Sequence, residues 1–359
     1  MHAANLMKAI TQKDPQAEFR VWGGDRMREA GGEVVKHIRE LAFMGFWEVI
    51  ANLRTILGLI RYAKRDLLSY NPDALILVDY PGFNLRMAEF AHANAIPVLY
   101  YISPQVWAWK QSRVKKIRKV VDEMLVILPF EQDFYRRHGM EVSFPGHPLL
   151  DEVIPKKKAN DYAAFRKKHL LPDKPIVALL PGSRKQEIKR MLKSMAALAP
   201  DFPECHFVVA GLSSHDPTTY DACRHYDNVS LVSDETYALL ANAEAALVAS
   251  GTATLETALF GVPQVVCYKA NPLSYLIARQ LIRVPYISLV NLIMDKPVLR
   301  EIIQRDFTHE ELRKQLRQLL YDKNRRAELA RDYAALEVRL GGEGASAEAA
   351  RIIVEKLRT

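Results

Sequence analysis

The chain alternates short apolar runs with longer segments in which apolar residues recur every three or four positions. Short apolar runs bounded by turn residues are typical of buried strands, and the recurring segments are typical of helices that cover a sheet. This alternation predicts an α/β fold with parallel sheets. The predicted strands are residues 19–22, 74–79, 98–102, 124–128, 142–144, 176–180, 207–210, 229–232, 245–249 and 264–268.

Two interruptions divide the alternation. Pro145-Gly-His-Pro148, with the Lys156–Lys158 run behind it, marks a linker near residue 150, and Gly341-Gly-Glu-Gly344 sets a last helix apart. The pattern predicts an N-terminal domain of residues 1–152, a C-terminal domain of residues 153–340, and a terminal helix, 341–359, that packs back on the N-terminal domain. Each domain is expected to be a doubly wound parallel sheet, and the two are expected to face an inter-domain cleft.

Composition narrows the class of protein and leaves its partner open. With 359 residues and 49% hydrophobic content, the chain can bury a large core. Its three cysteines have no C-x-x-C spacing, which is typical of free thiols in a reducing cytoplasm. We expect neither a signal peptide nor a spanning helix, since no apolar run reaches about twenty residues. The formal charge of +8 favours an anionic partner, and a phosphate, a membrane or a nucleic acid would each satisfy it.

The segment after residue 245 carries the clearest chemical signal. An apolar run breaks at Ser250-Gly251-Thr252, and a segment with helical character follows. A strand, a glycine turn and a helix start present backbone N–H groups and the positive helix end to an anion. Glu256 lies four residues after Thr252 on the same face, one position too late for a capping box. An acid beside a phosphate site suits ribose hydroxyls; the alternative is an exposed glutamate on an ordinary strand–turn–helix unit.

A second turn of this kind follows the strand at 176–180. It reads Pro181-Gly182-Ser183-Arg184-Lys185 and leads into a helix. A cation at a helix start destabilises the helix by roughly a few tenths of a kcal/mol, because it is repelled by the positive end of the helix dipole. An anion bound between the turn and the basic side chains would remove that cost. A basic surface turn is the alternative. Because both turns follow strands of one predicted sheet, they are expected to converge on a pyrophosphate site.

Two further polar residues stand at or within apolar runs. Asp79 ends a buried run, and ligands of open α/β sheets lie beyond the carboxyl ends of strands, so we interpret Asp79 as functional. A turn or cap role is the alternative, although Asn84 is better placed to cap the following helix. Asn291 interrupts the apolar run 286–293, where a buried amide must be hydrogen-bonded. A structural bond and a substrate contact are equally consistent with that position.

Two segments of the N-terminal half indicate unusual surfaces. Residues 41–68 carry a wide apolar arc, which fits either core packing or a surface for acyl chains and a bilayer interface. Two tryptophans followed by a basic stretch indicate a solvated helix face, an interface with anionic lipid or sugar phosphate, or a nucleic-acid patch without a recognised module. The candidate residues of these surfaces are Phe43, Met44, Phe46, Trp47, Trp107, Trp109, Lys110, Arg113 and Lys116.

Metal ligands have no support in the sequence. The ten histidines show neither H-x-x-x-H nor H-E-x-x-H spacing, and no Asp-x-Asp pair occurs. We therefore expect no metal and no other cofactor. A leaving diphosphate would be stabilised by Arg184, by Lys185 or Lys269, and by helix N-termini.

Six short stretches together resemble the lipid-A-disaccharide synthase family of Gram-negative bacteria. They occur in the family's order and cover nearly the whole chain. The stretches are Leu41-Ala-Phe-Met-Gly45, Val78-Asp-Tyr-Pro-Gly-Phe-Asn84, Tyr101-Ile-Ser-Pro-Gln-Val-Trp-Ala-Trp109, Leu179-Leu-Pro-Gly-Ser-Arg184, Ala249-Ser-Gly-Thr-Ala-Thr-Leu-Glu256 and Ser288-Leu-Val-Asn-Leu292.

The resemblance implies a metal-independent, inverting GT-B glycosyltransferase. It would transfer 2,3-diacylglucosamine from UDP to the 6-hydroxyl of 2,3-diacylglucosamine 1-phosphate (lipid X) and release UDP. The N-terminal domain would take the acceptor and the C-terminal domain UDP. By position, Asp79 matches the family's proposed base, while Arg184, Glu256 and Asn291 match residues important for activity. The residues expected to bind UDP are Ser183, Arg184, Ser250, Gly251, Thr252 and Glu256, and Asn291 is expected to bind substrate.

The resemblance also implies partners and a location. The partners would be UDP-2,3-diacylglucosamine, lipid X and the lipid surface of the inner membrane, without nucleic acid, and a homodimer is left open. The protein would be cytoplasmic and peripheral on the inner face of the inner membrane. Rival interpretations are another GT-B enzyme, such as a UDP-N-acetylglucosamine 2-epimerase or a lipid-intermediate transferase, and an inactive membrane-associated binding module.

The chain departs from the family at two places. Family members usually begin with a strand and a Gly-Glu-Ala-Ser-Gly-Asp loop, whereas this sequence starts at Met1-His-Ala-Ala-Asn-Leu-Met. A domain without that strand lacks a central member of its sheet, so we expect lower stability and little activity from the chain as written. Val290 stands where the family has proline before Asn291, a minor change.

Overall fold

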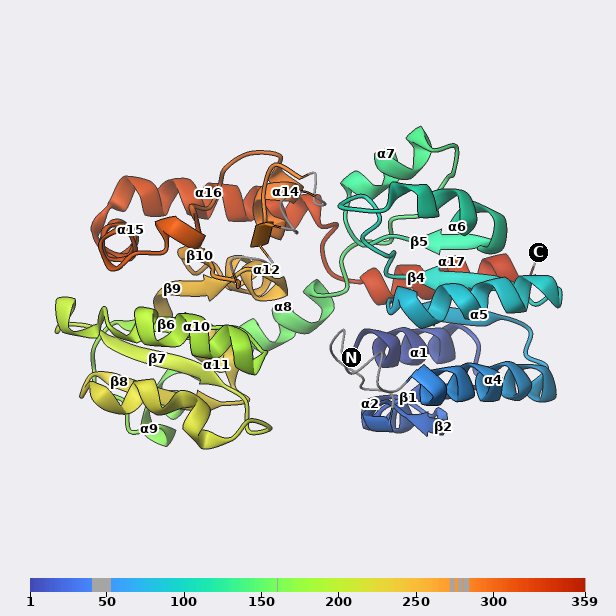
Figure 1. Cartoon of the computed structure of the whole chain (residues 1–359), viewed down its shortest axis with the longest axis horizontal. Coiled ribbons are helices and arrows are strands. Elements are labelled where there is room, and N and C mark those ends of the chain that lie inside the picture. The colour runs from blue at the N-terminus through green and yellow to red at the C-terminus, as the bar shows by residue number, and fades with distance from the viewer. Residues whose placement is uncertain (41–52, 160, 272–274, 277–279, 281–283, 359) are drawn as a thin grey trace. The chain divides into compact units, whose positions relative to one another are not determined.

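The apolar runs of the sequence form parallel strands, which confirms the predicted α/β class. The computed structural model describes residues 1–40, 53–159, 161–271, 275–276, 280 and 284–358. The chain divides into two units (Figure 1): unit 1 is Met1–Pro148 with Leu340–Thr359, and unit 2 is Leu149–Arg339.

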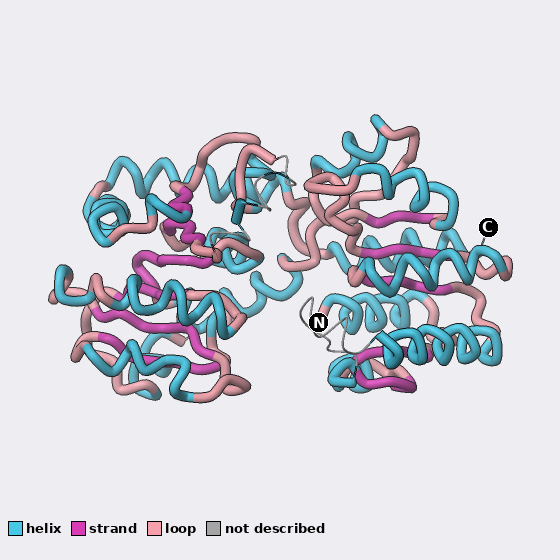
Figure 2. The backbone as a smooth tube through the Cα atoms, viewed as in Figure 1, coloured by secondary structure: helices cyan, strands magenta, loops and turns pink. Residues whose placement is uncertain are grey.

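Unit 2 contains, within the described residues, a six-stranded parallel sheet of order β11-β10-β9-β6-β7-β8. Figure 2 shows its strands running side by side. Its elements are α8 (Leu150–Lys158), α9 (Tyr162–Lys168), β6 (Ile176–Leu180), α10 (Lys185–Ala196), β7 (His206–Gly211), β8 (Val229–Ser233), α11 (Thr236–Ala241), β9 (Ala243–Ala249), α12 (Thr252–Leu259), β10 (Gln264–Tyr268), α14 (Leu289–Met294), β11 (Glu301–Ile303), α15 (His309–Tyr321) and α16 (Lys323–Arg339).

The middle of this sheet is the pair β6 and β9. All five residues of β6 are buried, and Ala178 and Leu180 lie opposite Ala246 and Val248 of β9. The chain builds β7 and β8 on one side of this pair and β10 and β11 on the other. The strand order therefore reverses between β6 and β9, which makes their carboxyl ends the topological switch point where doubly wound sheets bind ligands.

Unit 1 contains two parallel sheets within the described residues, β1-β2 and β3-β4-β5. This differs from the single doubly wound sheet predicted for the N-terminal half, because β1 and β3 do not pair in the described structure. The elements of the unit are α1 (His2–Lys13), β1 (Arg20–Gly23), α2 (Asp25–Glu29), β2 (Glu33–His37), α4 (Leu53–Tyr70), β3 (Leu75–Val78), α5 (Pro81–Ala93), β4 (Val98–Tyr101), α6 (Val114–Val120), β5 (Glu123–Leu125), α7 (Phe130–Arg137) and α17 (Ala345–Arg358).

Helices α1 and α17 come from opposite ends of the chain and share one core (Figure 1). Leu6 and Ile10 of α1 pack with Ala350 and Ile353 of α17, and Tyr101 of β4 belongs to the same cluster. Alanine on α17 allows the helices to approach closely. The terminal helix therefore adds its apolar face to the core of unit 1.

Two local predictions are wrong. Residues 142–144 form a single parallel bridge, Ser143 with Leu125, instead of a strand, because Pro145 follows and has no N–H to continue a ladder. Asn84 does not cap α5: the helix begins at Pro81, which supplies a fixed φ at the first helical turn and needs no cap there. Of the predicted apolar arc at residues 41–68, residues 41–52 lie outside the described residues. The rest belongs to α4, where Ile60 and Leu67 are buried and Leu57 is exposed.

Candidate active site

The turn after β6 needs its glycine. Gly182 has φ +108°, and a Cβ there would stand 2.6 Å from Oε2 of Glu187. The Ser183 carbonyl accepts a hydrogen bond of 2.8 Å from Nε2 of His215. Arg184, whose side chain is 75% exposed, forms an ion pair of 3.2 Å with Glu187. The turn is thus fixed by its neighbours and leaves a guanidinium at the surface, able to meet an anion.

The turn after β9 leaves space above its backbone. A Cβ built on Gly251 would meet no atom within 4 Å, so packing against the described protein does not require glycine there. Helix α12 begins directly afterwards. Its N-cap residue is Gly251, so no capping side chain occupies the first N–H groups of the helix. Exposed N–H groups at a helix start beside open space are a suitable place for a phosphate.

Ser250, predicted to bind UDP, uses its hydroxyl proton within the protein. Its Oγ donates to the Ile287 carbonyl at 2.9 Å. A phosphate needs donors, and this one is already used. Ser250 instead ties the glycine turn to the segment that precedes α14.

Glu256 is partly buried one turn into α12. Oε1 accepts a hydrogen bond of 3.2 Å from the Tyr237 hydroxyl of α11. Burial raises the pKa of Glu256, and the Tyr237 bond and the nearby Lys156 charge lower it. Lys156 Nζ also lies 4.7 Å from the centroid of the Tyr237 ring. The carboxylate is held from one side and keeps acceptor capacity for a hydroxyl ligand.

Asn291 is fully engaged by the protein, which supports the structural alternative over a substrate contact. Its Oδ1 accepts from Leu299 N at 2.7 Å, and Nδ2 donates to the Leu299 carbonyl at 2.9 Å and to Glu301 at 3.0 Å. The Glu301 carboxylate also accepts from the backbone N–H groups of Ile287 and Ser288. Both amide protons are used, so the side chain has no donor left for a substrate.

Asp79 follows β3 at the carboxyl edge of the β3-β4-β5 sheet. Asp79 is exposed as a residue, but partial burial of its carboxyl raises the pKa of that group, and the backbone N–H of Tyr80 lowers it. Asp79 and Tyr80 have φ angles of +47° and +42°, and Ile102, after the neighbouring strand, has +64°. Non-glycine residues held in this region cost on the order of 1–3 kcal/mol each, and such strain clusters at functional sites.

The predicted aromatic and basic surface is present only in part. Trp107 is 9% exposed and packs edge-on against Phe130 at 5.0 Å, so its prediction as a surface residue is wrong. Trp109 is 42% exposed, and Lys110 Nζ lies 4.5 Å and the Arg113 guanidinium carbon 5.5 Å from its ring centroid. We call Trp109, Lys110 and Arg113 the Trp109 cluster.

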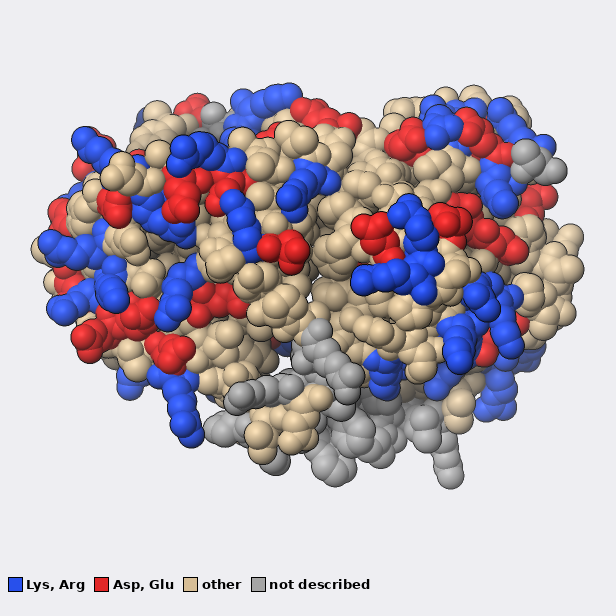
Figure 3. All heavy atoms as spheres, turned by 90° about the horizontal axis from the view of Figure 1, so that it is seen from above, with Lys and Arg blue, Asp and Glu red and all other residues tan. Residues whose placement is uncertain are grey.

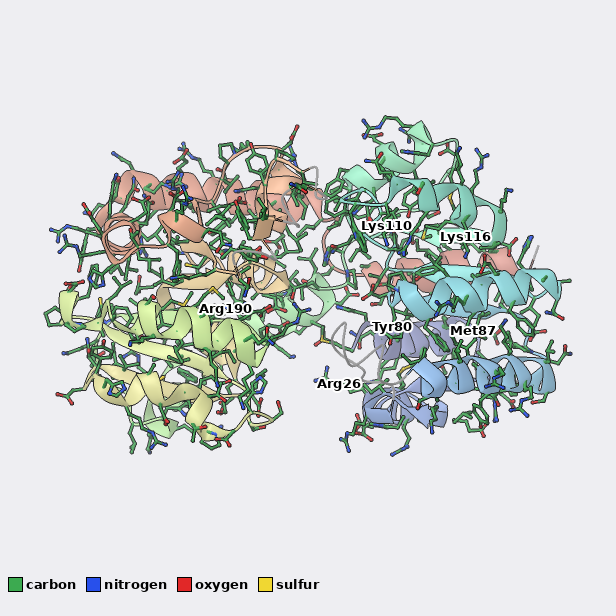
Figure 4. The ribbon with its side chains drawn as sticks, viewed as in Figure 1. Arg26, Tyr80, Met87, Lys110, Lys116 and Arg190 are labelled. Atoms are coloured by element: carbon green, nitrogen blue, oxygen red, sulfur yellow. The ribbon has the colours of Figure 1, made fainter. Side chains whose placement is uncertain are left out.

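Charge elsewhere is dispersed. Lys116, labelled with Lys110 in Figure 4, is paired with Glu89 at 2.5 Å. On the face drawn in Figure 3, basic and acidic side chains intermix over each unit. The net charge of +8 is therefore not gathered into one patch on that face. Phe43, Met44, Phe46 and Trp47 lie outside the described residues.

Three further properties bear on the chemistry. In the described part of the chain, no group of three or more histidine, cysteine or acidic side chains could hold a metal ion. The three cysteines are buried free thiols. Among the helices that the structure describes, none is long and apolar enough to cross a membrane.

The sequence did not reveal three residues that organise the site: His215, Tyr237 and Glu301. His215 is 32 positions from its partner, Tyr237 is 19 from Glu256, and Glu301 is 14 from Ile287. No short-range motif joins such pairs. The one sequence feature that could have indicated a functional residue is the position of Glu301 at the start of a short apolar run, whereas Asp79 stands at the end of one.

Comparisons with known proteins identify one family by sequence and related folds by structure. The family model described as lipid-A-disaccharide synthetase matches residues 1–356. The chain is 41% identical to the lipid-A-disaccharide synthase of Syntrophus aciditrophicus (strain SB), over 98% of this chain and 93% of the relative. Its fold is similar to UDP-GlcNAc 2-epimerase from Neisseria meningitidis bound to UDP-GlcNAc, with a TM-score of 0.67, 13% identity and coverage of 99% and 96%. The kitacinnamycin glycotransferase also has a TM-score of 0.67, at 14% identity and coverage of 99% and 95%.

Proposed function

The chain belongs to the lipid-A-disaccharide synthase family, and from this premise we propose that it transfers 2,3-diacylglucosamine from UDP to the 6-hydroxyl of lipid X. The observation that carries the proposal is the family match along residues 1–356. The two glycine-containing turns at the switch point of the unit 2 sheet support the proposal, because the start of α12 and the exposed Arg184 guanidinium would suit a diphosphate.

The chemical step is an inverting displacement. The acceptor 6-hydroxyl oxygen attacks the anomeric carbon of the donor, the bond from that carbon to the UDP oxygen breaks, and the hydroxyl proton passes to Asp79. A carboxylate is a stronger base when its pKa lies closer to the working pH, and burial moves the pKa of Asp79 in that direction.

Unit 2 supplies the groups for the leaving UDP. The start of α12 and the Arg184 guanidinium offer positive charge to the diphosphate as negative charge develops on it. Glu256, fixed by Tyr237, accepts hydrogen bonds from ribose hydroxyls. Neither role requires a metal.

The acyl chains of both substrates connect the reaction with a lipid surface. We propose that the protein is peripheral on the inner face of the inner membrane and that the Trp109 cluster contacts anionic headgroups. Replacing Lys110 and Arg113 by glutamine should weaken sedimentation with vesicles that contain anionic lipid, and added salt should weaken it further. Lys116→Gln, at a cation already paired with Glu89, is the matched control.

UDP release from UDP-2,3-diacylglucosamine, measured with and without lipid X, tests the transferase proposal. We expect release to require lipid X, Asp79→Asn to lower kcat by about a hundredfold, and Glu256→Gln to raise KM for the donor. Release at the same rate without lipid X would exclude this reaction. A 2-epimerase would instead act on UDP-N-acetylglucosamine without any acceptor.

A further inference from the structure

We propose that Tyr100 and Asn84 are positioning residues that hold the turn Asp79–Tyr80 in a left-handed conformation and thereby aim the Asp79 carboxyl. The inference rests on the proposed function, in which that carboxyl is the base. It assigns a role to two buried side chains that need not touch either substrate.

The turn adopts a conformation that its own residues do not favour. Asp79 and Tyr80 both have positive φ angles, +47° and +42°. Aspartate tolerates this region moderately well, but a tyrosine there is unusual. Tyr80, labelled at the start of α5 in Figure 4, is 55% exposed, so burial of its ring does not account for the conformation.

Side chains from two different elements meet on one backbone oxygen. The Tyr100 hydroxyl of β4 donates to the Asp79 carbonyl at 2.6 Å. Nδ2 of Asn84, in α5, donates to the same carbonyl at 2.7 Å and to the Val78 carbonyl at 3.1 Å. Tyr100 is fully buried and Asn84 is 9% exposed, so neither donor can be replaced cheaply by water.

The convergence exceeds what satisfying a carbonyl requires. One donor is sufficient to pair a buried backbone oxygen. Two donors, one from the neighbouring strand and one from the following helix, fix the direction of the Asp79 peptide plane as well. The Asp79 N–H is fixed too, by the Tyr101 carbonyl at 3.1 Å. With both peptide planes held, the Cα–Cβ bond of Asp79 has one direction, which a general base needs for its geometry.

The experiment compares Tyr100→Phe in two backgrounds. In the parent, removing the hydroxyl should lower kcat about tenfold with KM for the donor changed less than about twofold, because only the base is misaligned. In Asp79→Asn, the same substitution should change the residual rate less than about twofold, because residues that act as one unit are not additive. UDP release with lipid X is the readout in all four proteins.

Tyr333→Phe is the matched control, since Tyr333 is also a buried tyrosine that donates to a backbone carbonyl, that of Val262 at 3.2 Å. It should lose stability to a similar extent and keep the parental kcat. Asn84→Ala serves as a second variant should Tyr100→Phe not fold, and its expected pattern is the same: loss in the parent and none in Asp79→Asn.

The outcomes are distinct. If Tyr100→Phe lowers the rate by the same factor in both backgrounds, or keeps parental kcat, the positioning role is overturned while the base stands. Parental activity of Asp79→Asn would overturn the base itself, and the positioning role with it, and that single variant identifies the case. Loss in the parent alone supports the proposal.

Discussion

Glu131 is the buried carboxyl whose titration should be measurable in the stability of the protein. It is 1% exposed, and Oε2 accepts from the backbone N–H groups of Ile127 and Leu128 at 3.2 and 2.9 Å. Burial raises its pKa from 4.5 to about 7, against the lowering effect of these bonds. The folded state therefore binds a proton between pH 4.5 and 7 that the unfolded state has lost.

The sign follows from that proton. The contribution of Glu131 to stability is largest below pH 4.5 and declines as pH rises to about 7, by on the order of 3 kcal/mol at 1.36 kcal/mol per pKa unit. Glu131→Gln should flatten this decline when urea unfolding is measured at pH 5 and pH 8. Glu123→Gln, at a carboxylate that accepts from Ser143, is the control. An unchanged slope in Glu131→Gln would contradict the assignment.

Backbone strain at Tyr80 predicts an unusual order of stabilities. Glycine adopts a positive φ without the steric penalty of a Cβ, whereas alanine keeps that penalty and also loses the ring. We therefore expect Tyr80→Gly to be more stable than Tyr80→Ala by about 1 kcal/mol. Urea midpoints of the two variants provide the measurement, and an alanine variant at least as stable as the glycine variant would mean that the turn is unstrained.

At the scale of elements, Asn291 and Glu301 fold the segment from Ile287 to Glu301 around α14. Asn291→Ala would leave the buried N–H and carbonyl of Leu299 without their partner, a loss of about 1–3 kcal/mol for each such group. We expect a fall of at least about 2 kcal/mol in the free energy of unfolding. Asn94→Ala removes the exposed hydrogen bond from the Asn94 side-chain amide to the Phe90 carbonyl. It should lower the free energy of unfolding by less than about 1 kcal/mol.

The same variant separates two roles for Asn291. If the amide acts only by holding the segment, Asn291→Ala should lose activity in proportion to its folded fraction, and stabilising the fold by lower temperature should restore it. A fully folded variant that stays inactive would restore the prediction of a substrate contact.

Elements were predictable to the extent that periodicity determines them. The strands at 176–180, 207–210, 245–249 and 264–268 were evident because an inner parallel strand is a continuous apolar run. Trp107 and Trp109 lie in a turn and a bend between β4 and α6, where no regular period relates sequence to burial, so the sequence could not separate them into a buried and an exposed residue. The direction of the Ser250 hydroxyl and the bond from Tyr100 to Asp79 depend on partners that only the fold brings close.

At the scale of the whole molecule, the candidate nucleotide site can be tested by where a ligand protects the backbone. The groups assigned to UDP all belong to unit 2: the turns at Pro181–Arg184 and Ser250–Thr252, and Glu256. The segment at Ile287, which Ser250 holds by a hydrogen bond, belongs to the same unit. A ligand that binds only the folded state stabilises it by RT ln(1 + [L]/Kd), about 2.7 kcal/mol at a hundred times Kd.

Saturating UDP should therefore slow amide hydrogen exchange at residues 181–187, 250–258 and 286–291 more than at β1, β2 or α4. Arg184→Ala should reduce this protection at equal UDP concentration, because the guanidinium contributes charge to the diphosphate. Arg136→Ala, at an exposed cation paired with Asp133 in unit 1, should leave the protection unchanged.

Ser250 joins the glycine turn to Ile287 through one hydrogen bond. Ser250→Ala should therefore uncouple the two stretches, so that UDP still protects residues 181–187 but no longer protects residues 286–291. Protection that leaves both glycine-containing turns unchanged would mean that the nucleotide binds elsewhere.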